Sequence, residues 1–150
     1  MDHSIEIIAR GLLLRGPYVL LCQNTKHGYW YLPGGHVEFG EAASVALARE
    51  FREECSLEVA PQECLLVTEA TFKAKRAHHE LNLVFRVSEA GTADSDVVSQ
   101  EDGVAFGWFE LAELLDLDVR PAAIKAWLLA GGRGDPSDTP CNFVSEIRPD

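Results

Sequence analysis

The pattern of apolar and polar positions divides the chain into short β-prone runs around one strongly helical stretch. Runs rich in Val, Ile, Leu and aromatic residues, bounded by Gly, Pro and Asn, predict strands. Residues 42–55 are rich in Ala, Leu, Glu and Arg and contain neither Gly nor Pro, which predicts a helix. The expected strands cover residues 4–14, 18–23, 57–60, 64–72, 79–87 and 104–108, and two later helices cover residues 111–115 and 122–130.

This order of elements predicts an α/β (α+β) fold with a mixed β-sheet between helices. The chain has 150 residues, of which 47% are hydrophobic, so it has the size and the apolar content of one domain. We expect that domain to cover residues 1–130. Residues 131–150 then form a C-terminal Gly/Pro-rich linker and tail, whose last part, residues 141–150, either packs back or frays.

Three carboxylates share one face of the expected helix. Glu50, Glu53 and Glu54 fall within an arc of about 100°, because positions three and four apart are neighbours on a helix surface. We expect this stripe to face outward and the other side of the helix to pack on the core. The apolar residues of that other side are Val45, Ala48, Phe51 and Cys55.

The carboxylate cluster predicts a site for a hard divalent cation. Like charges on one helix face repel each other, so a bound cation would relieve the repulsion. Mg²⁺ prefers oxygen ligands, and no Cys or His stands among these carboxylates as a zinc site would require. We therefore expect Mg²⁺, with Mn²⁺ as a substitute. A solvated acidic helix face is the alternative for the Glu-x-x-Glu-Glu pattern alone.

A longer pattern carries a resemblance to a known family. Gly35, five residues, Glu41, seven residues and the run 49–57 together resemble the 23-residue signature of the Nudix hydrolases. Residues 30–35 resemble the family's usual lead-in. One position departs, because Ser56 stands where the family has glycine. A residue that closes a helix often takes the left-handed conformation, so this substitution affects local geometry and not chemistry.

The resemblance implies a Nudix-like α/β/α sandwich and a role for each matching residue. Glu50, Glu53 and Glu54 are the implied metal ligands, and the carbonyl oxygen of Gly35 completes the metal shell. Arg49 is implied to orient a neighbouring carboxylate, and the remaining signature acid, Glu41, has a supporting role. Glycine suits such a position because it lets the backbone approach an ion closely.

Hydrolysis also requires a base near the attacking water, and two carboxylates are candidates. One is Glu54. The other is Glu101, in the loop before the expected strand 104–108, a region from which some Nudix enzymes by resemblance supply an extra carboxylate. An ordinary loop acid is the alternative for Glu101, and Glu80 is a weaker candidate.

Two further clusters have two interpretations each. The basic residues within 73–76 could contact substrate phosphates, although a solvated turn is the simpler interpretation. The aromatic run 29–31 could stack on a base or sugar, although core packing is the simpler interpretation. The pair at 78–79 lacks the spacing of a zinc motif.

Charge and cysteine content restrict the partners and the compartment. A formal net charge of −11 disfavours binding to extended nucleic acid or to an anionic membrane surface. Four scattered cysteines without a Cys-x-x-Cys pair favour reduced thiols. Together with the lack of a signal-like or spanning segment, this predicts a cytoplasmic protein that acts on a small nucleotide, either as a monomer or as a homodimer.

The predicted activity is Mg²⁺-dependent hydrolysis of a phosphoanhydride bond. The first hypothesis for the substrate is a nucleoside diphosphate linked to another moiety, such as ADP-ribose or a nucleotide sugar. The second is a nucleoside triphosphate, which includes the removal of oxidised nucleotides. A third class is a Nudix-like module that senses a nucleotide without hydrolysing it.

Overall fold

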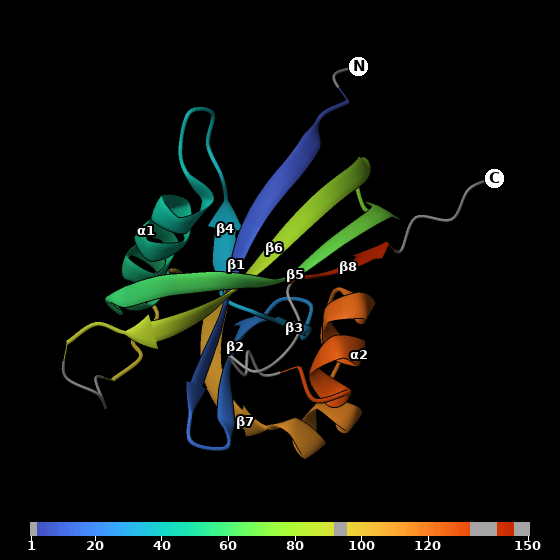
Figure 1. Ribbon diagram of the computed structural model, residues 1–150. Helices are drawn as coiled ribbons and strands as arrows, with labels where there is room; N and C mark the ends of the chain where they lie inside the picture. The colour runs from blue at the N-terminus through green and yellow to red at the C-terminus, as the bar shows by residue number, and fades with distance from the viewer. Residues whose placement is uncertain (1–2, 92–95, 133–140, 146–150) are drawn as a thin grey trace.

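The computed structural model describes residues 3–91, 96–132 and 141–145, with the backbone alone for 142–145 (Figure 1). The elements follow one another as β1 (Ile5–Arg15), β2 (Tyr18–Asn24), β3 (Trp30–Tyr31), β4 (Gly34–His36), α1 (Ala43–Cys55), β5 (Val59–Lys73), β6 (Ala77–Glu89), β7 (Val104–Glu110), the 3-10 helix η1 (Leu111–Asp116), α2 (Ala122–Leu129) and β8 (Asn142–Ser145).

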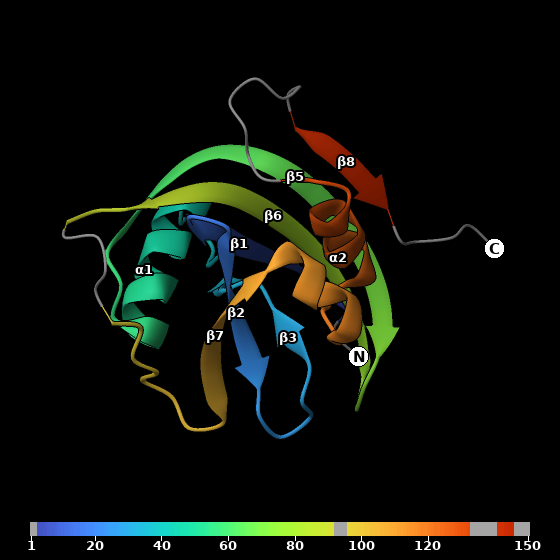
Figure 2. The same ribbon diagram turned by 90° about the horizontal axis from the view of Figure 1, so that it is seen from below.

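The described strands form one mixed sheet. Its main path is β3-β2-β1-β6-β5-β8, while β4 pairs with β1 and β7 pairs with β2. The pairs β1/β6 and β5/β8 are parallel and the others are antiparallel. Helix α1 lies on one side of the curved sheet, and α2 with η1 lies on the other (Figure 2). The predicted sandwich with a mixed sheet between helices is confirmed.

Each layer of helices has its own hydrophobic core. On the α1 side, Leu47 and Phe51 pack with apolar residues of β1 and β6, including Leu13 and Val87. On the other side, α2 and η1 cover apolar residues of β1, β5 and β6, namely Leu12, Leu66 and Val84. The sheet is therefore apolar on both faces near its centre, as a sheet covered on both sides requires.

Two strands differ from the sequence-based expectation. The separate strands expected over 57–60 and 64–72 are replaced by one strand, β5, which begins at Val59. It continues past Pro61 with register shifts between Pro61 and Cys64 and between Cys64 and Leu66. These bulges remove the conflict between a proline and a continuous ladder. The glycine loop expected before α1 contains the short strand β4, because Gly34 and Gly35 pair with β1.

Helix α1 buries a face that overlaps the expected one only in part, since Phe51 and Cys55 are buried as expected. Val45 is 58% exposed, whereas Ala46 and Leu47 are fully buried. The centre of the buried arc is therefore closer to Glu54 than the centre of the expected arc, and Glu54 is itself half-buried. The prediction of an outward acidic stripe was wrong for Glu50 and Glu54, because the helix packs with these carboxylates at the edge of its contact with the sheet.

The end of α1 has the geometry expected from its sequence. Ser56 adopts the left-handed conformation, with φ 57° and ψ 27°. Its backbone N–H donates to the carbonyl oxygen of Arg52, which satisfies one terminal group of the helix. The serine therefore fills the role that glycine usually has at this position.

The C-terminal segment is described only in part. Residues 133–140 and 146–150 lie outside the described residues, and they include most of the expected linker and part of the tail. Asn142–Ser145 form β8, which pairs in parallel with β5. Within the described chain, no helix combines the length and the apolar content needed to cross a membrane.

Candidate active site

Arg49 connects the carboxylates of the expected site. Its Nε and Nη2 donate to the two carboxylate oxygens of Glu41 over 2.9 and 3.0 Å. Its Nη1 donates to Glu50 over 3.0 Å and to Glu53 over 3.2 Å. Arg49 Nη2 also donates over 3.3 Å to the carbonyl oxygen of His36, the residue that follows Gly35. These bonds lower the pKa of Glu41 and hold the helix, the loop and β4 together.

Glu50 and Glu54 form a partly buried carboxylate pair. The Glu50 side chain is 15% exposed, and burial raises its pKa against the opposing charge of Arg49. Burial, followed by the charges of Glu50 and Glu101, raises the pKa of Glu54. The Oε2 atom of Glu54 is buried and lacks a hydrogen-bond partner among the described residues. Two adjacent buried carboxylates resist joint ionisation, so this pair favours either a shared proton or a cation.

Gly35 lies directly against the Glu50 carboxylate. Pairing between β4 and β1 sets Gly35 opposite Ala9 and places it beside α1. A Cβ at Gly35 would lie 2.4 Å from Glu50 Cδ, so only glycine fits this contact without displacing the carboxylate. The main chain therefore approaches the carboxylate pair as closely as a shared cation site would need.

The loop before β7 brings Glu101 to the same region. The N–H of Gln100 donates over 2.9 Å to the carbonyl oxygen of Glu54 at the C-terminal end of α1. Ser99 Oγ donates to Val104 O over 2.7 Å and to Glu101 O over 3.0 Å, which fixes the turn. The loop is thus docked on α1, and the charge of Glu101 reaches Glu54.

The donors present fit a hard divalent cation, although their arrangement is not that of a finished metal site. Among the described residues, no group of three His, Cys, Asp or Glu side chains is arranged to hold a metal ion. Arg49 occupies an oxygen of Glu50 and one of Glu53, whose side chain is 56% exposed. The buried unpartnered oxygen of Glu54 and the close approach of Gly35 nevertheless match the oxygen ligands that Mg²⁺ prefers.

Arg10 is a partly buried arginine beside this region, and its role was not predicted from the sequence. Its Nε donates to Asn82 Oδ1 over 2.8 Å, and its Nη1 donates to Leu32 O over 3.1 Å. Its guanidinium also lies 5.5 Å from the centroid of the Tyr31 ring. Burial lowers the pKa of Arg10, and the charge of Glu80 opposes this effect. The one signal available was a cation within an apolar strand.

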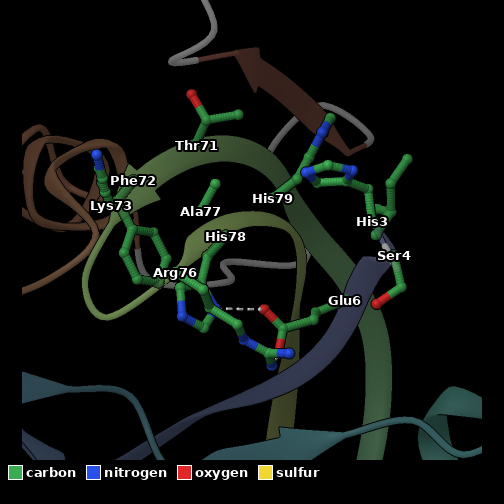
Figure 3. A pocket seen from close by; sticks show the side chains of 11 residues that line it. His3, Ser4, Glu6, Thr71, Phe72, Lys73, Arg76, Ala77, His78 and His79 are labelled. Carbon is green, nitrogen blue, oxygen red and sulfur yellow. Dashed lines mark hydrogen bonds and ion pairs between the residues drawn. The ribbon is translucent and has the colours of Figure 1, made fainter. Parts of the chain in front are cut away.

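A cavity of about 440 Å³ opens at the end of the sheet where β1 starts and where β5 connects to β6 (Figure 3). Glu6 points into it, with Oε2 3.0 Å from His78 Nδ1, Oε1 3.1 Å from His36 Nε2 and Arg76 at 4.0 Å. The Phe72 ring stacks on His78 with centroids 4.7 Å apart. Since the carbonyl oxygen of His36 binds Arg49, one residue connects the cavity with the carboxylates.

Comparison with known proteins gives the family. The profile of the NUDIX domain matches residues 7–128. A putative 8-oxo-dGTP diphosphatase 2 of Mycobacterium tuberculosis is 33% identical over 135 residues, which cover 82% of this chain and 85% of that protein. The nucleoside triphosphatase NudI of Escherichia coli is 30% identical over 115 residues, with 69% and 77% covered.

Solved structures share the fold. A MutT protein from Methanosarcina mazei Go1 superposes with a TM-score of 0.68 at 21% identity and covers 87% of this chain and 94% of that one. An ADP-ribose pyrophosphatase from Streptococcus suis gives a TM-score of 0.57 at 20% identity, with 94% and 98% covered. With the profile match over most of the chain, these likenesses show that the chain belongs to the Nudix family and is a Nudix hydrolase.

Proposed function

We propose that this Nudix hydrolase is a Mg²⁺-dependent pyrophosphohydrolase of nucleoside triphosphates. The observation that carries the proposal is the partly buried Glu50–Glu54 pair, in which Glu50 lies against Gly35 and Glu54 has a buried oxygen with no hydrogen-bond partner among the described residues. The names of the two relatives at 30% identity or more favour triphosphates over the nucleoside diphosphate derivatives that we expected first. ADP-ribose and nucleotide sugars therefore become the second substrate class.

In this proposal each site residue has a separate role. Glu50, Glu53 and Glu54 with the Gly35 carbonyl would hold Mg²⁺, or Mn²⁺ in its place. The ion supplies the positive charge that polarises the phosphoryl oxygens. Arg49 keeps Glu50 and Glu53 aligned, as its bonds to both indicate. The proton of the attacking water passes to Glu54 or Glu101.

The nucleoside would lie in the cavity beside Glu6. Its volume suits a base and a sugar, and His78 and Phe72 already form an aromatic stack that a base can join. Glu6 accepts hydrogen bonds, so it suits the N–H groups of a base. His36 joins the two regions, since its ring contacts Glu6 and its carbonyl oxygen accepts a hydrogen bond from Arg49, and the phosphates of a nucleotide bound in the cavity would extend toward the carboxylates.

A product-resolved assay tests the proposal. The full chain is incubated with Mg²⁺ and a panel of triphosphates, 8-oxo-dGTP, ADP-ribose and nucleotide sugars. Triphosphates should give a nucleoside monophosphate and pyrophosphate. The Glu53→Gln and Glu54→Gln variants should lose at least about 10²-fold in kcat, equal to about 2.7 kcal/mol.

Matched variants make the result specific. Glu58→Gln removes an exposed acid that is bound only to Arg52 in the described structure, and its kcat should stay within about 2-fold of wild type. Glu101→Gln, compared with Glu54→Gln across pH, assigns the base, because loss of the base removes the acidic limb of the rate profile. No turnover of any substrate would instead favour a nucleotide-sensing module.

A further inference from the structure

Two of the four cysteines meet at the edge of the sheet. Cys64 lies on β5, and Cys141 directly precedes β8. Their Sγ atoms are 3.8 Å apart, although the two residues are separated by 77 positions in the chain. This contact is independent of the carboxylate site and of the cavity.

The strand pairing explains why these two thiols meet. Strands β5 and β8 run in parallel with Leu66 opposite Asn142, so this register brings Cys141 beside Leu65, the neighbour of Cys64. The register of β5 against β6 also shifts between Cys64 and Leu66. Cys64 therefore lies at a bulge, where a strand bends and re-aims its side chains. Its thiol contacts Leu66 O over 3.6 Å as well as Cys141.

We propose that Cys64 and Cys141 are a peroxide-oxidisable thiol pair that forms a reversible disulfide between β5 and the segment entering β8. The exposed Cys141 sulfur attacks one oxygen of the peroxide, the O–O bond breaks, and a sulfenic acid forms with loss of water. The Cys64 thiolate then attacks that sulfur, the S–O bond breaks, and a second water leaves. Both sulfurs are oxidised and both peroxide oxygens are reduced.

The geometry requires little movement for this bond. A disulfide has an S–S length of about 2.05 Å, so the two sulfurs need to approach by less than about 2 Å. Rotation of the exposed Cys141 side chain provides part of this approach without moving the sheet.

Accessibility makes the reaction selective among the four thiols. Cys22 and Cys55 are completely buried, whereas Cys64 is half-buried and Cys141 is exposed. Burial, followed by the neighbouring Cys141, raises the pKa of the Cys64 thiol to about 11. Because the thiolate is the attacking form, disulfide formation should be slow at neutral pH and faster as the pH rises.

The disulfide would hold β8 on β5. Within the described residues, four residue pairs join the two strands, and β8 lies at the end of the sheet path. A covalent bond beside this short ladder prevents β8 from separating while β5 stays folded. It also restricts the unfolded chain by closing a long loop.

The test uses the full chain, reduced and then treated with hydrogen peroxide. Titratable thiols under denaturing conditions should fall from four to two, with a mass loss of two hydrogen atoms that dithiothreitol reverses. Digestion with trypsin and Glu-C, which cuts at Glu58 and Glu63 between Cys55 and Cys64, should yield a Cys64–Cys141 linked peptide. Oxidation should raise the melting temperature by about 5 °C and slow β8 amide exchange by at least about 10-fold.

Three variants complete the experiment. Cys64→Ser and Cys141→Ser should each lose the linked peptide and the rise in melting temperature. Cys22→Ala keeps both partners and should still form the bond. The proposal is overturned if four thiols survive in the wild type, if Cys22 and Cys55 are linked instead, or if peroxide yields only dimers joined through Cys141.

Discussion

A single methyl group at Gly35 tests whether the Glu50 carboxylate must lie where the structure places it. In Gly35→Ala the new Cβ would be 2.4 Å from Glu50 Cδ and 2.6 Å from each carboxylate oxygen. Non-bonded carbon atoms rest about 3.5–4.0 Å apart, so the carboxylate has to retreat by about 1 Å. Gly35 does not have a positive φ, so alanine adds no backbone strain.

This displacement should affect activity more than folding. A misplacement of about 1 Å at a reacting centre can cost about 10²-fold in rate, and we expect kcat of Gly35→Ala to fall by that order. Mn²⁺ affinity, measured by calorimetry, should fall with it. The group that must move is the end of a flexible side chain, and alanine restricts the unfolded chain, so the free energy of unfolding should change by less than about 1 kcal/mol.

Two variants control for the added methyl group. Gly40→Ala adds the same group in open space at a φ of +79°, so it should lose stability and keep kcat. Glu50→Asp introduced into Gly35→Ala shortens the displaced side chain and should recover part of the lost rate. Wild-type kcat together with wild-type Mn²⁺ affinity in Gly35→Ala would refute the assignment of Glu50 and Gly35 to one site.

Three further predictions concern packing, pH and the cavity. Gly11→Ala places a Cβ 2.5 Å from Phe51 Cε2, and this overpacking should cost about 1–3 kcal/mol in urea unfolding; an unchanged midpoint would contradict it. A hydrogen bond with His78 lowers the pKa of Glu6, so its stabilising effect is complete above about pH 4.5 and is lost as the pH falls further. Glu6→Gln should therefore be less stable than wild type near neutral pH, with a difference that narrows toward about pH 3; a pH-independent difference would argue against this. Phe72→Ala should raise KM by about 10-fold at nearly constant kcat, because stacking on a base is worth about 1–3 kcal/mol, and a loss confined to kcat would exclude base stacking there.

The sequence predicts most reliably what depends on neighbours along the chain. The helix that carries Glu50, Glu53 and Glu54 follows from local composition, and the left-handed Ser56 follows from the way helices end. The buried face of that helix followed only for Phe51 and Cys55, because carboxylates are expected to avoid the core and Glu54 does not. Val45 shows the error, since it is exposed while Glu54 is turned toward the sheet.

Features that depend on distant pairing could not be predicted in the same way. Gly34 and Gly35 are typical of a loop in the sequence, but they form β4 because they pair with β1. The pairing is so close that a Cβ at Gly34 would lie 1.9 Å from Ala9 O, so this position requires glycine. Pro61 suggests a break, and β5 continues because a bulge accommodates it. Arg10 lies in an apolar strand, and its role depends on Asn82, which is 72 residues away.

The environment of a carboxylate depends on tertiary structure in the same way, and Glu53 and Glu54 show this most directly. They are adjacent, chemically identical and on one helix, yet Glu53 is 56% exposed and bound to Arg49, whereas Glu54 has a buried oxygen that no described residue bonds. Their environments differ because successive residues of a helix are rotated by about 100° about its axis, and this rotation turns Glu53 toward solvent and Glu54 toward the sheet. Only Glu54 lies where burial and two other carboxylates act together on its charge. A cation bound beside Glu50 and Glu54 would relieve the repulsion between these two carboxylates, so its binding should release a proton from the pair.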